Sequence, residues 1–211
     1  QADGWHMVTT EAQPIVRFGP QAVGKLTWSL TGAHNHKNAL AAMAAAMHAG
    51  VTPAQALDAL NQFSGVKRRM EQRGVINEVT VYDDFAHHPT AIATTLEGLR
   101  EQVGDARILA VLEPRSNTMK LGAMAARLPD SLKAADMTFC FAGGQGKQSL
   151  GWDPAQVMAS LGNRLVVVDD INTLVEQVVA KAQPGDHVVV MSNGGFGGFH
   201  DKLLKALESR P

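Results

Sequence analysis

Apolar and polar positions follow two different patterns along the 211 residues of the chain. The first part carries short strand-like runs, separated by the turn-forming stretches Gln13-Pro14 and Gly19-Pro20-Gln21. This spacing predicts antiparallel strands over residues 5–10, 15–18 and 23–30.

Two helices are predicted to follow these strands. An alanine- and methionine-rich segment opens within residues 31–38 and runs to Gly50, a residue that commonly ends helices. The next stretch, Thr52-Pro53-Ala54-Gln55, has a cap residue, a proline in the first turn and a glutamine three residues after the cap. This pattern predicts a second helix that ends near Phe63.

Beyond Ser64-Gly65-Val66 the pattern changes to near-continuous apolar strands that alternate with helices. Such strands are typical of a mainly parallel sheet covered on both faces, which gives a Rossmann-like, doubly wound α/β fold. The chain is therefore expected to divide into residues 1–64 and residues 65–211. Strands are predicted at 79–83, 108–112, 137–141, 165–168 and 187–191, and helices near 89–103, 120–128, 154–161, 171–182 and 199–207.

Composition limits the class of protein. Hydrophobic residues make up 45% of the chain and charged residues 18%, which is ordinary for a globular domain. No apolar run approaches the roughly 20 residues that span a bilayer. The single cysteine, Cys140, excludes an internal disulfide framework and is expected to be a buried, inert thiol in a reducing compartment. The start, Gln1-Ala2-Asp3-Gly4-Trp5, has neither an initiator methionine nor a leader pattern, which suggests a fragment.

The net charge of −1 leaves one basic cluster, Lys67-Arg68-Arg69 with Arg73 nearby. It is too small for a nucleic-acid surface but suits one phosphate group. We therefore expect a small anionic ligand.

The stretch Asp83-Asp84-Phe85-Ala86-His87-His88-Pro89-Thr90 follows a β-branched strand and leads into a helix that ends near Gly104. Loops at the carboxyl ends of strands bind ligands in open α/β sheets, so this loop is a candidate site. A local role is the alternative: Asp84 could accept hydrogen bonds from loop amides, and His88 could cap the helix.

Two glycine clusters are candidate phosphate loops. For the stretch 143–149, the first glycine of a P-loop would fall just before it, at Phe141, and Gln148 stands where serine or threonine should follow the lysine. It is rejected. The stretch Ser192-Asn193-Gly194-Gly195-Phe196-Gly197-Gly198-Phe199 stands between the last strand and the last helix, where amides can meet an anion. It lacks dinucleotide spacing, so a tight turn is favoured.

Three motifs together resemble the Mur ligase family, ATP-dependent enzymes that form amide bonds in bacterial cell-wall synthesis. They are Gly32-Ala33-His34-Asn35-His36-Lys37-Asn38-Ala39, Gly65-Val66-Lys67-Arg68-Arg69-Met70-Glu71 and the 83–90 stretch. Residues 112–120, Leu112-Glu113-Pro114-Arg115-Ser116-Asn117-Thr118-Met119-Lys120, and residues 191–198 look most like the branch that recycles the murein tripeptide.

The resemblance assigns nucleotide contacts residue by residue. His34, Asn35 and Asn38 would lie near the adenine of ATP, and the amide of asparagine suits adjacent donor and acceptor atoms there. Ordinary helix-start chemistry is the alternative for both asparagines. Asp84 would hold the ribose hydroxyls, and Arg69 would approach the phosphates on domain closure. Arg68 is expected to be a solvated neighbour.

The resemblance also assigns the amine substrate. His87 and His88 would line the amine site as catalytic residues, and no metal is assigned to them. Arg115 would grip the free carboxylate of meso-diaminopimelate bidentately. Supporting substrate contacts are expected from Ser116, Asn117, Lys120, Ser192 and Asn193. A plain helix cap is the alternative for Ser116 or Asn117.

The family's phosphate loop, magnesium-binding acids and UDP-sugar domain have no counterpart in the sequence. Residues 1–64 therefore look like the end of a central ATP-binding domain, and residues 65–211 like the C-terminal domain. The implied cofactors are ATP and Mg²⁺, with the metal ligands upstream. The implied partners are UDP-N-acetylmuramate, the tripeptide L-Ala-γ-D-Glu-meso-diaminopimelate and the missing domains of the same chain, in the bacterial cytoplasm without nucleic acid or membrane.

The implied reaction joins the tripeptide to UDP-N-acetylmuramate through an acyl phosphate. The fragment alone is expected to be inactive. Three alternatives stay open: a ligase for L-alanine, in which Pro-His-Arg would be expected near residue 114; a non-catalytic nucleotide-binding module of the same fold; and a Rossmann dehydrogenase, disfavoured by the missing fingerprint.

Overall fold

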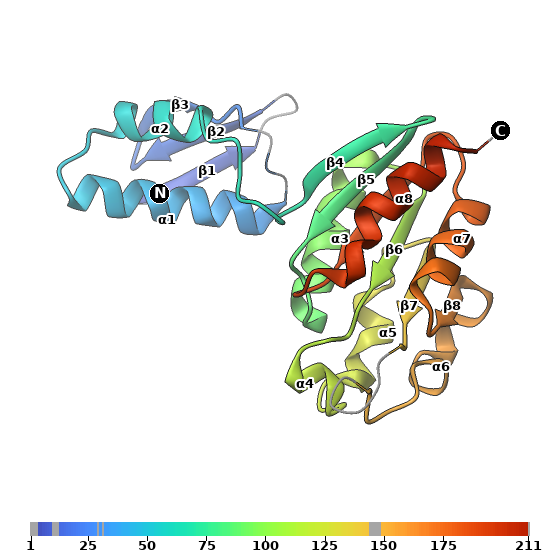
Figure 1. Ribbon diagram of the computed structural model, residues 1–211. Coiled ribbons are helices and arrows are strands. Elements are labelled where there is room, and N and C mark those ends of the chain that lie inside the picture. Colours follow the sequence, from blue (N-terminus) through green and yellow to red (C-terminus); the bar gives the residue numbers. More distant parts are fainter. Residues whose placement is uncertain (1–3, 10–12, 29, 31, 144–148, 211) are drawn as a thin grey trace. The chain divides into compact units, whose positions relative to one another are not determined.

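The computed structural model describes residues 4–9, 13–28, 30, 32–143 and 149–210. The chain forms two compact units, Gln1–Val66 and Lys67–Pro211 (Figure 1). The change of pattern predicted at Ser64-Gly65-Val66 lies next to the border between them. Within the described residues, no helix has both the length and the apolar character needed to cross a membrane.

The first unit is a small antiparallel sheet with two helices. Its strands pair in the order β1-β2-β3, and the pairing is antiparallel, as the sequence predicted. Helix α2 begins with the predicted capping box of Thr52 and Gln55. Buried side chains from strands and helices form its core: Val16, Leu26, Ala39, Met43, Ala56 and Leu57. The elements are β1 (Trp5–Thr9), β2 (Pro14–Phe18), β3 (Gln21–Lys25), α1 (Ala33–His48) and α2 (Pro53–Asn61).

The strand predicted over 23–30 is shorter than expected, since β3 ends at Lys25. The side chain of Asn61 takes over the backbone groups there. Its Oδ1 accepts from the Thr27 amide at 2.8 Å and its Nδ2 donates to the Lys25 carbonyl at 3.1 Å. The strand pairing therefore gives way to a side-chain contact with the end of α2.

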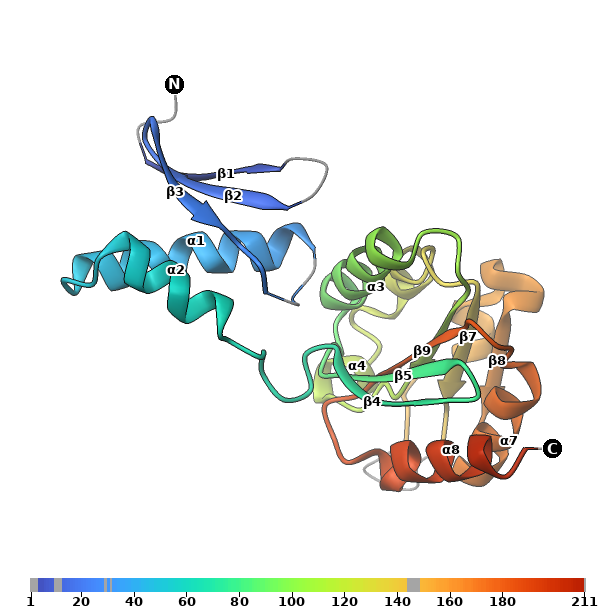
Figure 2. The same cartoon turned by 90° about the horizontal axis from the view of Figure 1, so that it is seen from above.

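The second unit is built on a six-stranded sheet with the order β4-β5-β9-β6-β7-β8 (Figure 2). All neighbouring pairs are parallel except β4 with β5. The strands are β4 (Glu71–Ile76), β5 (Val79–Asp84), β6 (Ile108–Leu112), β7 (Met137–Phe141), β8 (Leu165–Val168) and β9 (His187–Met191). The doubly wound, mainly parallel fold expected from the sequence is confirmed.

Helices cover both faces of this sheet. On one face, Ile92, Leu96 and Leu99 of α3 (Pro89–Val103) pack against β5, β6 and β9. On the other, Leu174 of α7 (Ile171–Lys181) and Leu203 of α8 (Phe199–Glu208) pack against alternate residues of the same strands. Apolar side chains on both faces explain why these strands are near-continuous apolar runs in the sequence.

Strand β4 was missed by the sequence analysis. Its residues, Glu71-Gln72-Arg73-Gly74-Val75-Ile76, are largely polar and half-buried or exposed, because the strand lies at the edge of the sheet. The pairing with β5 shifts register between Gln72 and Gly74. A bulged polar edge strand carries little of the apolar pattern that predicts a strand.

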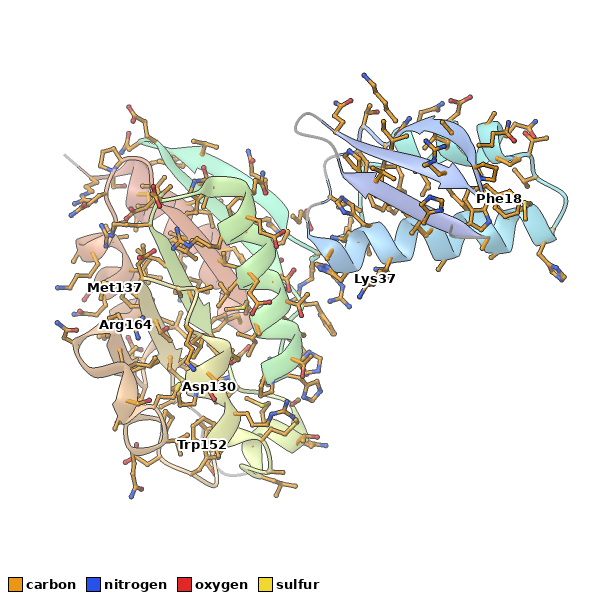
Figure 3. The ribbon with its side chains drawn as sticks, turned by 180° about the vertical axis from the view of Figure 1, so that it is seen from behind. Phe18, Lys37, Asp130, Met137, Trp152 and Arg164 are labelled. Atoms are coloured by element: carbon orange, nitrogen blue, oxygen red, sulfur yellow. The ribbon has the colours of Figure 1, made fainter. Side chains whose placement is uncertain are left out.

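Two predicted helices are broken into short pieces. The helix expected over 120–128 is replaced by α4 (Asn117–Lys120), a 3₁₀ turn η1 (Ala125–Arg127) and α5 (Leu128–Ser131). Gly122 has φ +75°, and the Met119 carbonyl accepts from Trp152 Nε1 at 2.6 Å (Trp152 is labelled in Figure 3). The helix expected over 154–161 is α6 (Pro154–Val157) followed by the 3₁₀ segment η3 (Ala159–Arg164), broken at Gly162 with φ +57°.

Cys140 is fully buried in β7, and its burial raises the thiol pKa to about 12. The thiol is therefore protonated and unreactive, as the sequence predicted.

Candidate substrate pocket and nucleotide contacts

Three loops far apart in the sequence meet at the carboxyl ends of adjacent strands. Strand β9 lies between β5 and β6, and Met191 pairs in register with both Asp84 and Leu112. The ladder continues beyond the strands: the Ser192 amide donates to the Asp84 carbonyl at 3.1 Å, and the Glu113 amide donates to the Met191 carbonyl at 3.0 Å. The motifs at 83–90, 112–120 and 191–198 therefore lie side by side at the carboxyl ends of the parallel strands.

A pocket of about 340 Å³ opens between two of these loops. Five of the six predicted substrate residues line it, together with one glycine. The lining residues are Arg115, Ser116, Asn117, Lys120, Asn193 and Gly194. Two cationic side chains and two amides face the same space, which suits an anionic, hydrogen-bonding ligand.

The side chains of the pocket differ in the hydrogen bonds and ion pairs that they make within the protein. Ser116 is the N-cap of α4, where its hydroxyl accepts from the Met119 amide at 3.3 Å, so the cap expected as its alternative role is present. The Arg115 side chain is 43% exposed, and its Nη1 is 4.0 Å from Glu113 Oε1. Among the described residues, the buried Oδ1 of Asn193 has no hydrogen-bond partner.

Ser192, the sixth predicted substrate residue, is fully buried and does not line the pocket. Its hydroxyl bonds to Glu113 Oε2 and accepts from the Gly194 amide at 2.9 Å. Ser192 therefore stabilises the loop conformation without lining the pocket. Sequence reasoning missed Glu113 and Gly194; the position of Glu113, directly after a buried strand and before Pro114-Arg115, was the signal available.

Asp84 has the loop role that was considered as its alternative. It is 3% exposed, and its carboxylate accepts from the amides of Met70 at 2.9 Å and Ala86 at 2.7 Å. Burial raises its pKa, although these amides, the nearby Arg69 charge and the Thr95 hydroxyl oppose the shift. The ribose contact stays a prediction.

The two neighbouring arginines both lie near the Phe85 ring, with Arg68 5.3 Å from its centroid, but they differ in exposure and in their polar contacts. Arg69 is exposed, and its guanidinium lies 5.8 Å from the centroid of the Phe85 ring. Arg68, expected to be solvated, instead pairs with the buried Asp83 at 3.2 Å and donates to two carbonyls of the Ser192 loop. The prediction for Arg68 was wrong because sequence spacing cannot show that Asp83 and the loop lie beside it.

His87 and His88 form a ring pair with centroids 4.2 Å apart. His87 Nδ1 is 2.8 Å from the Phe85 carbonyl. His88 is the N-cap residue of α3, but its side chain makes no capping hydrogen bond, and its buried Nδ1 has no partner in the part of the chain that the structure describes. Within the same residues, no group of three or more acidic, histidine or cysteine side chains is arranged for a metal ion.

His34, Asn35 and Asn38 all lie in the first turns of α1, where spacings of three and four residues place them on one side of the helix. His34 and Asn38 are exposed. They belong to the first compact unit, and Arg69 and Asp84 belong to the second. Their adenine contact stays a prediction.

The glycine cluster after β9 forms the tight turn that was favoured. The 3₁₀ turn η4 (Phe196–Gly198) has positive φ at Phe196, Gly197 and Gly198. Phe196 is buried and stacks on Phe199 with ring centroids 5.0 Å apart. Of the rejected P-loop stretch, residues 144–148 lie outside the described part of the chain.

A doubly wound α/β domain with a cationic pocket at the carboxyl ends of its strands belongs to the Rossmann-like class. Residues 68–194 match the family model of the Mur ligase, glutamate ligase domain. The chain belongs to the Mur ligase family, as its motifs indicated.

Named relatives refine the comparison. The chain is 51% identical over 205 residues to the UDP-N-acetylmuramate–L-alanyl-γ-D-glutamyl-meso-2,6-diaminoheptandioate ligase of Escherichia coli, covering 96% of this chain and 44% of that protein. It is 33% identical over 213 residues to a UDP-N-acetylmuramate–L-alanine ligase of Mycobacterium sp., covering 98% and 44%. A crystal structure of a murein peptide ligase from Psychrobacter arcticus matches with 38% identity and a TM-score of 0.72, covering 98% and 45%. The chain thus spans less than half the length of these relatives.

Proposed function

We propose that this chain is part of an ATP-dependent ligase that joins L-Ala-γ-D-Glu-meso-diaminopimelate to UDP-N-acetylmuramate in peptidoglycan recycling. The observation that carries the proposal is the pocket at 115–120 and 193–194. Arg115, Lys120 and two asparagines line it at the carboxyl ends of the strands. The higher identity to the tripeptide ligase of Escherichia coli than to the L-alanine ligase supports the same choice.

The chemistry of the pocket favours the tripeptide over free L-alanine. The far end of meso-diaminopimelate carries a carboxylate and an amine beyond the atoms that react. The Arg115 guanidinium can meet the carboxylate bidentately, and the amide oxygen of the exposed Asn117, which also lines the pocket, can accept from the amine. Free L-alanine has one carboxylate and no distal amine, so it could use only part of this pocket.

The proposed reaction has two steps. The γ-phosphoryl group of ATP is transferred to the lactyl carboxylate of UDP-N-acetylmuramate, which gives ADP and an acyl phosphate. The free amine of the tripeptide attacks the acyl carbon, the amide bond forms, and phosphate leaves. Arg69, exposed beside the Phe85 ring, is proposed to neutralise phosphate charge on domain closure.

Asn35, Asn38, Arg69 and Asp84 are the residues proposed to contact ATP in the full-length enzyme. The exposed Arg69 suits a phosphate, and the side-chain amide of Asn38 suits an adenine edge. Mg²⁺ would neutralise phosphate charge, with its ligands outside this chain. We propose that the 211-residue chain alone has no turnover.

The test is an assay of the full-length enzyme with ATP, UDP-N-acetylmuramate and either the tripeptide or L-alanine. Release of ADP with formation of the UDP-N-acetylmuramoyl tripeptide, at a kcat/KM at least about a hundredfold above that for L-alanine, is expected. Preference for L-alanine would favour the alternative ligase. Nucleotide binding without ADP release for either amine would favour a non-catalytic module.

A further inference from the structure

The side chain of Arg68 connects the start of the second unit to one wall of the substrate pocket. Its Nη2 donates to the Ser192 carbonyl at 2.5 Å and to the Gly194 carbonyl at 2.9 Å. Its Nε donates to Asp83 Oδ1 at 3.2 Å. One planar guanidinium therefore contacts a strand and both ends of a three-residue loop.

The backbone of Arg68 is itself held in an uncommon conformation. Its φ is +58°, its amide donates to Glu71 Oε2 at 2.9 Å, and its carbonyl accepts from the Phe85 amide at 2.8 Å. A non-glycine residue in the left-handed region is retained where the surroundings stabilise it. These contacts fix the point from which the side chain reaches the loop.

The loop lies between two arginines. On one side, Arg68 binds the carbonyls of Ser192 and Gly194. On the pocket side, the Gly194 backbone lies so close to Arg115 that a Cβ there would be 2.4 Å from Arg115 Nη1. A shift of Gly194 would therefore change the volume available to the Arg115 guanidinium.

We infer that Arg68 is a positioning residue for the substrate pocket: it holds the wall formed by residues 192–194 at the distance from Arg115 that substrate binding requires. Arg68 does not line the pocket and acts through the loop. Its planar fork supplies three donors in fixed directions, which the ammonium of lysine cannot reproduce. The kinetic part of this inference rests on the proposed function.

Arg73 provides a matched control, because it shares one partner of Arg68 but not the loop. Arg73 Nη1 is 3.7 Å from the other oxygen of Asp83, and its Nη2 is 3.6 Å from Asp201. The side chains of Arg68 and Arg73 are 28% and 34% exposed. Both substitutions to alanine remove an ion pair with the buried Asp83, so a purely structural role predicts similar effects.

The experiment uses full-length wild type, Arg68→Ala, Arg68→Lys and Arg73→Ala. Hydrogen exchange of the 192–195 amides is measured by mass spectrometry, and KM is measured for the tripeptide and for UDP-N-acetylmuramate. In Arg68→Ala, exchange at 192–195 and KM for the tripeptide should each rise at least about tenfold, with KM for UDP-N-acetylmuramate unchanged. Arg68→Lys should fall between, and serves if Arg68→Ala does not fold. Arg73→Ala should change neither quantity.

Three results would overturn the inference. One is unchanged exchange at 192–195 in both Arg68 variants, and another is faster exchange with an unchanged KM for the tripeptide. The third is an equal response of Arg73→Ala. If the wild-type enzyme does not use the tripeptide, the proposed function fails on its own, and the exchange data still decide whether Arg68 fixes the loop.

Discussion

The backbone of Gly194 lies directly against the guanidinium of Arg115. A Cβ built on Gly194 would lie 2.4 Å from Nη1 of Arg115 and 2.8 Å from its Cδ, well inside van der Waals contact. Glycine at this position therefore sets the room that the arginine has in the pocket. Because the atoms in conflict belong to a flexible, half-exposed side chain, the fold can tolerate a larger residue while the site cannot.

The first prediction follows from this contact. Gly194→Ala should raise KM for the tripeptide about tenfold or more, because the new methyl displaces Arg115, and should shift the melting temperature little. Gly195→Ala is the matched control: its φ is −78°, and a Cβ there meets nothing within 4 Å. Steady-state kinetics and melting curves of the full-length enzyme give both quantities. Equal kinetics of the two variants would refute the prediction.

The same contact predicts non-additivity. In an Arg115→Ala background, Gly194→Ala should cause little further loss, because the side chain that it displaces is gone. Full additivity of the two effects on KM would mean that Gly194 acts through another group. A double-mutant cycle in the full-length enzyme measures this directly.

Arg115→Ala itself should raise KM for the tripeptide by about 10- to 150-fold and leave KM for UDP-N-acetylmuramate nearly unchanged. Losing a hydrogen-bonded pair between arginine and carboxylate is typically worth about 1.5–3 kcal/mol. Arg115→Lys should rescue in part, since it keeps the charge but not the fork. The exposed Arg127, which does not line the pocket, is the control for loss of one positive charge. Kinetics with each substrate varied separately give the two KM values. An equal rise in both would contradict the prediction.

Arg69→Ala in the full-length enzyme should lower kcat by about 10³-fold with a much smaller effect on ATP binding. The reason is that a residue delivered on closure stabilises charge in the phosphoryl-transfer transition state. Lys67→Ala, two residues away and also exposed, should retain most of the activity. Rapid-quench measurement of ADP formation tests this prediction. An unchanged kcat would exclude Arg69 from the site.

Stability should fall as the pH is lowered through the titration of His187. Its Nδ1 is 3.1 Å from the Tyr82 hydroxyl, and burial lowers its pKa below 6.5 despite the opposing charge of Asp186. The unfolded chain therefore binds a proton before the folded chain does, so stability present above about pH 6.5 is lost as the pH falls through the lower folded pKa. Calorimetry from about pH 7.5 to pH 5 should show a shallower decrease for His187→Gln than for wild type.

Two controls sharpen this measurement. His48 is exposed on the first unit, and His48→Gln should leave the pH dependence of the second unit's transition as it is in wild type. Burial also lowers the pKa of His200, next to Asp83, so part of the slope should persist in His187→Gln. An unchanged slope in His187→Gln would show that His187 does not contribute.

Local signals in the sequence were sufficient for most of the regular elements. The proline and glycine around α3 predicted residues 89–103, and the helix is Pro89–Val103. The capping box of Thr52 and Gln55 formed as predicted. These features depend only on residues a few positions apart in the chain, so they can be predicted directly from the sequence. Elements stabilised by distant partners, such as the polar edge strand β4 and the broken segments after α4 and α6, were missed or misjudged.

The candidate site shows the same division. Motifs supplied Arg115, Asn117, Lys120 and Asn193, whose chemistry suits a carboxylate ligand, and the structure places them in one pocket. Glu113, Gly194 and the role of Arg68 escaped the sequence analysis. Each of them matters through a contact with a residue remote in the chain, such as the 2.5 Å hydrogen bond between Arg68 and the Ser192 carbonyl.

By itself, the sequence determined the class of fold, the family and the side chains available for chemistry, because apolar periodicity, caps and motifs are local properties. Only the tertiary structure decided that β9, the last strand in the chain, lies between β5 and β6. Every buried parallel strand has the same near-continuous apolar pattern, so its sequence does not encode its place in the sheet. That placement is fixed by pairing with β6, 79 residues earlier in the chain (Ile108 with His187), and with β5, 107 residues earlier (Thr80 with His187), and it brings the Ser192 loop to Arg115 and Arg68.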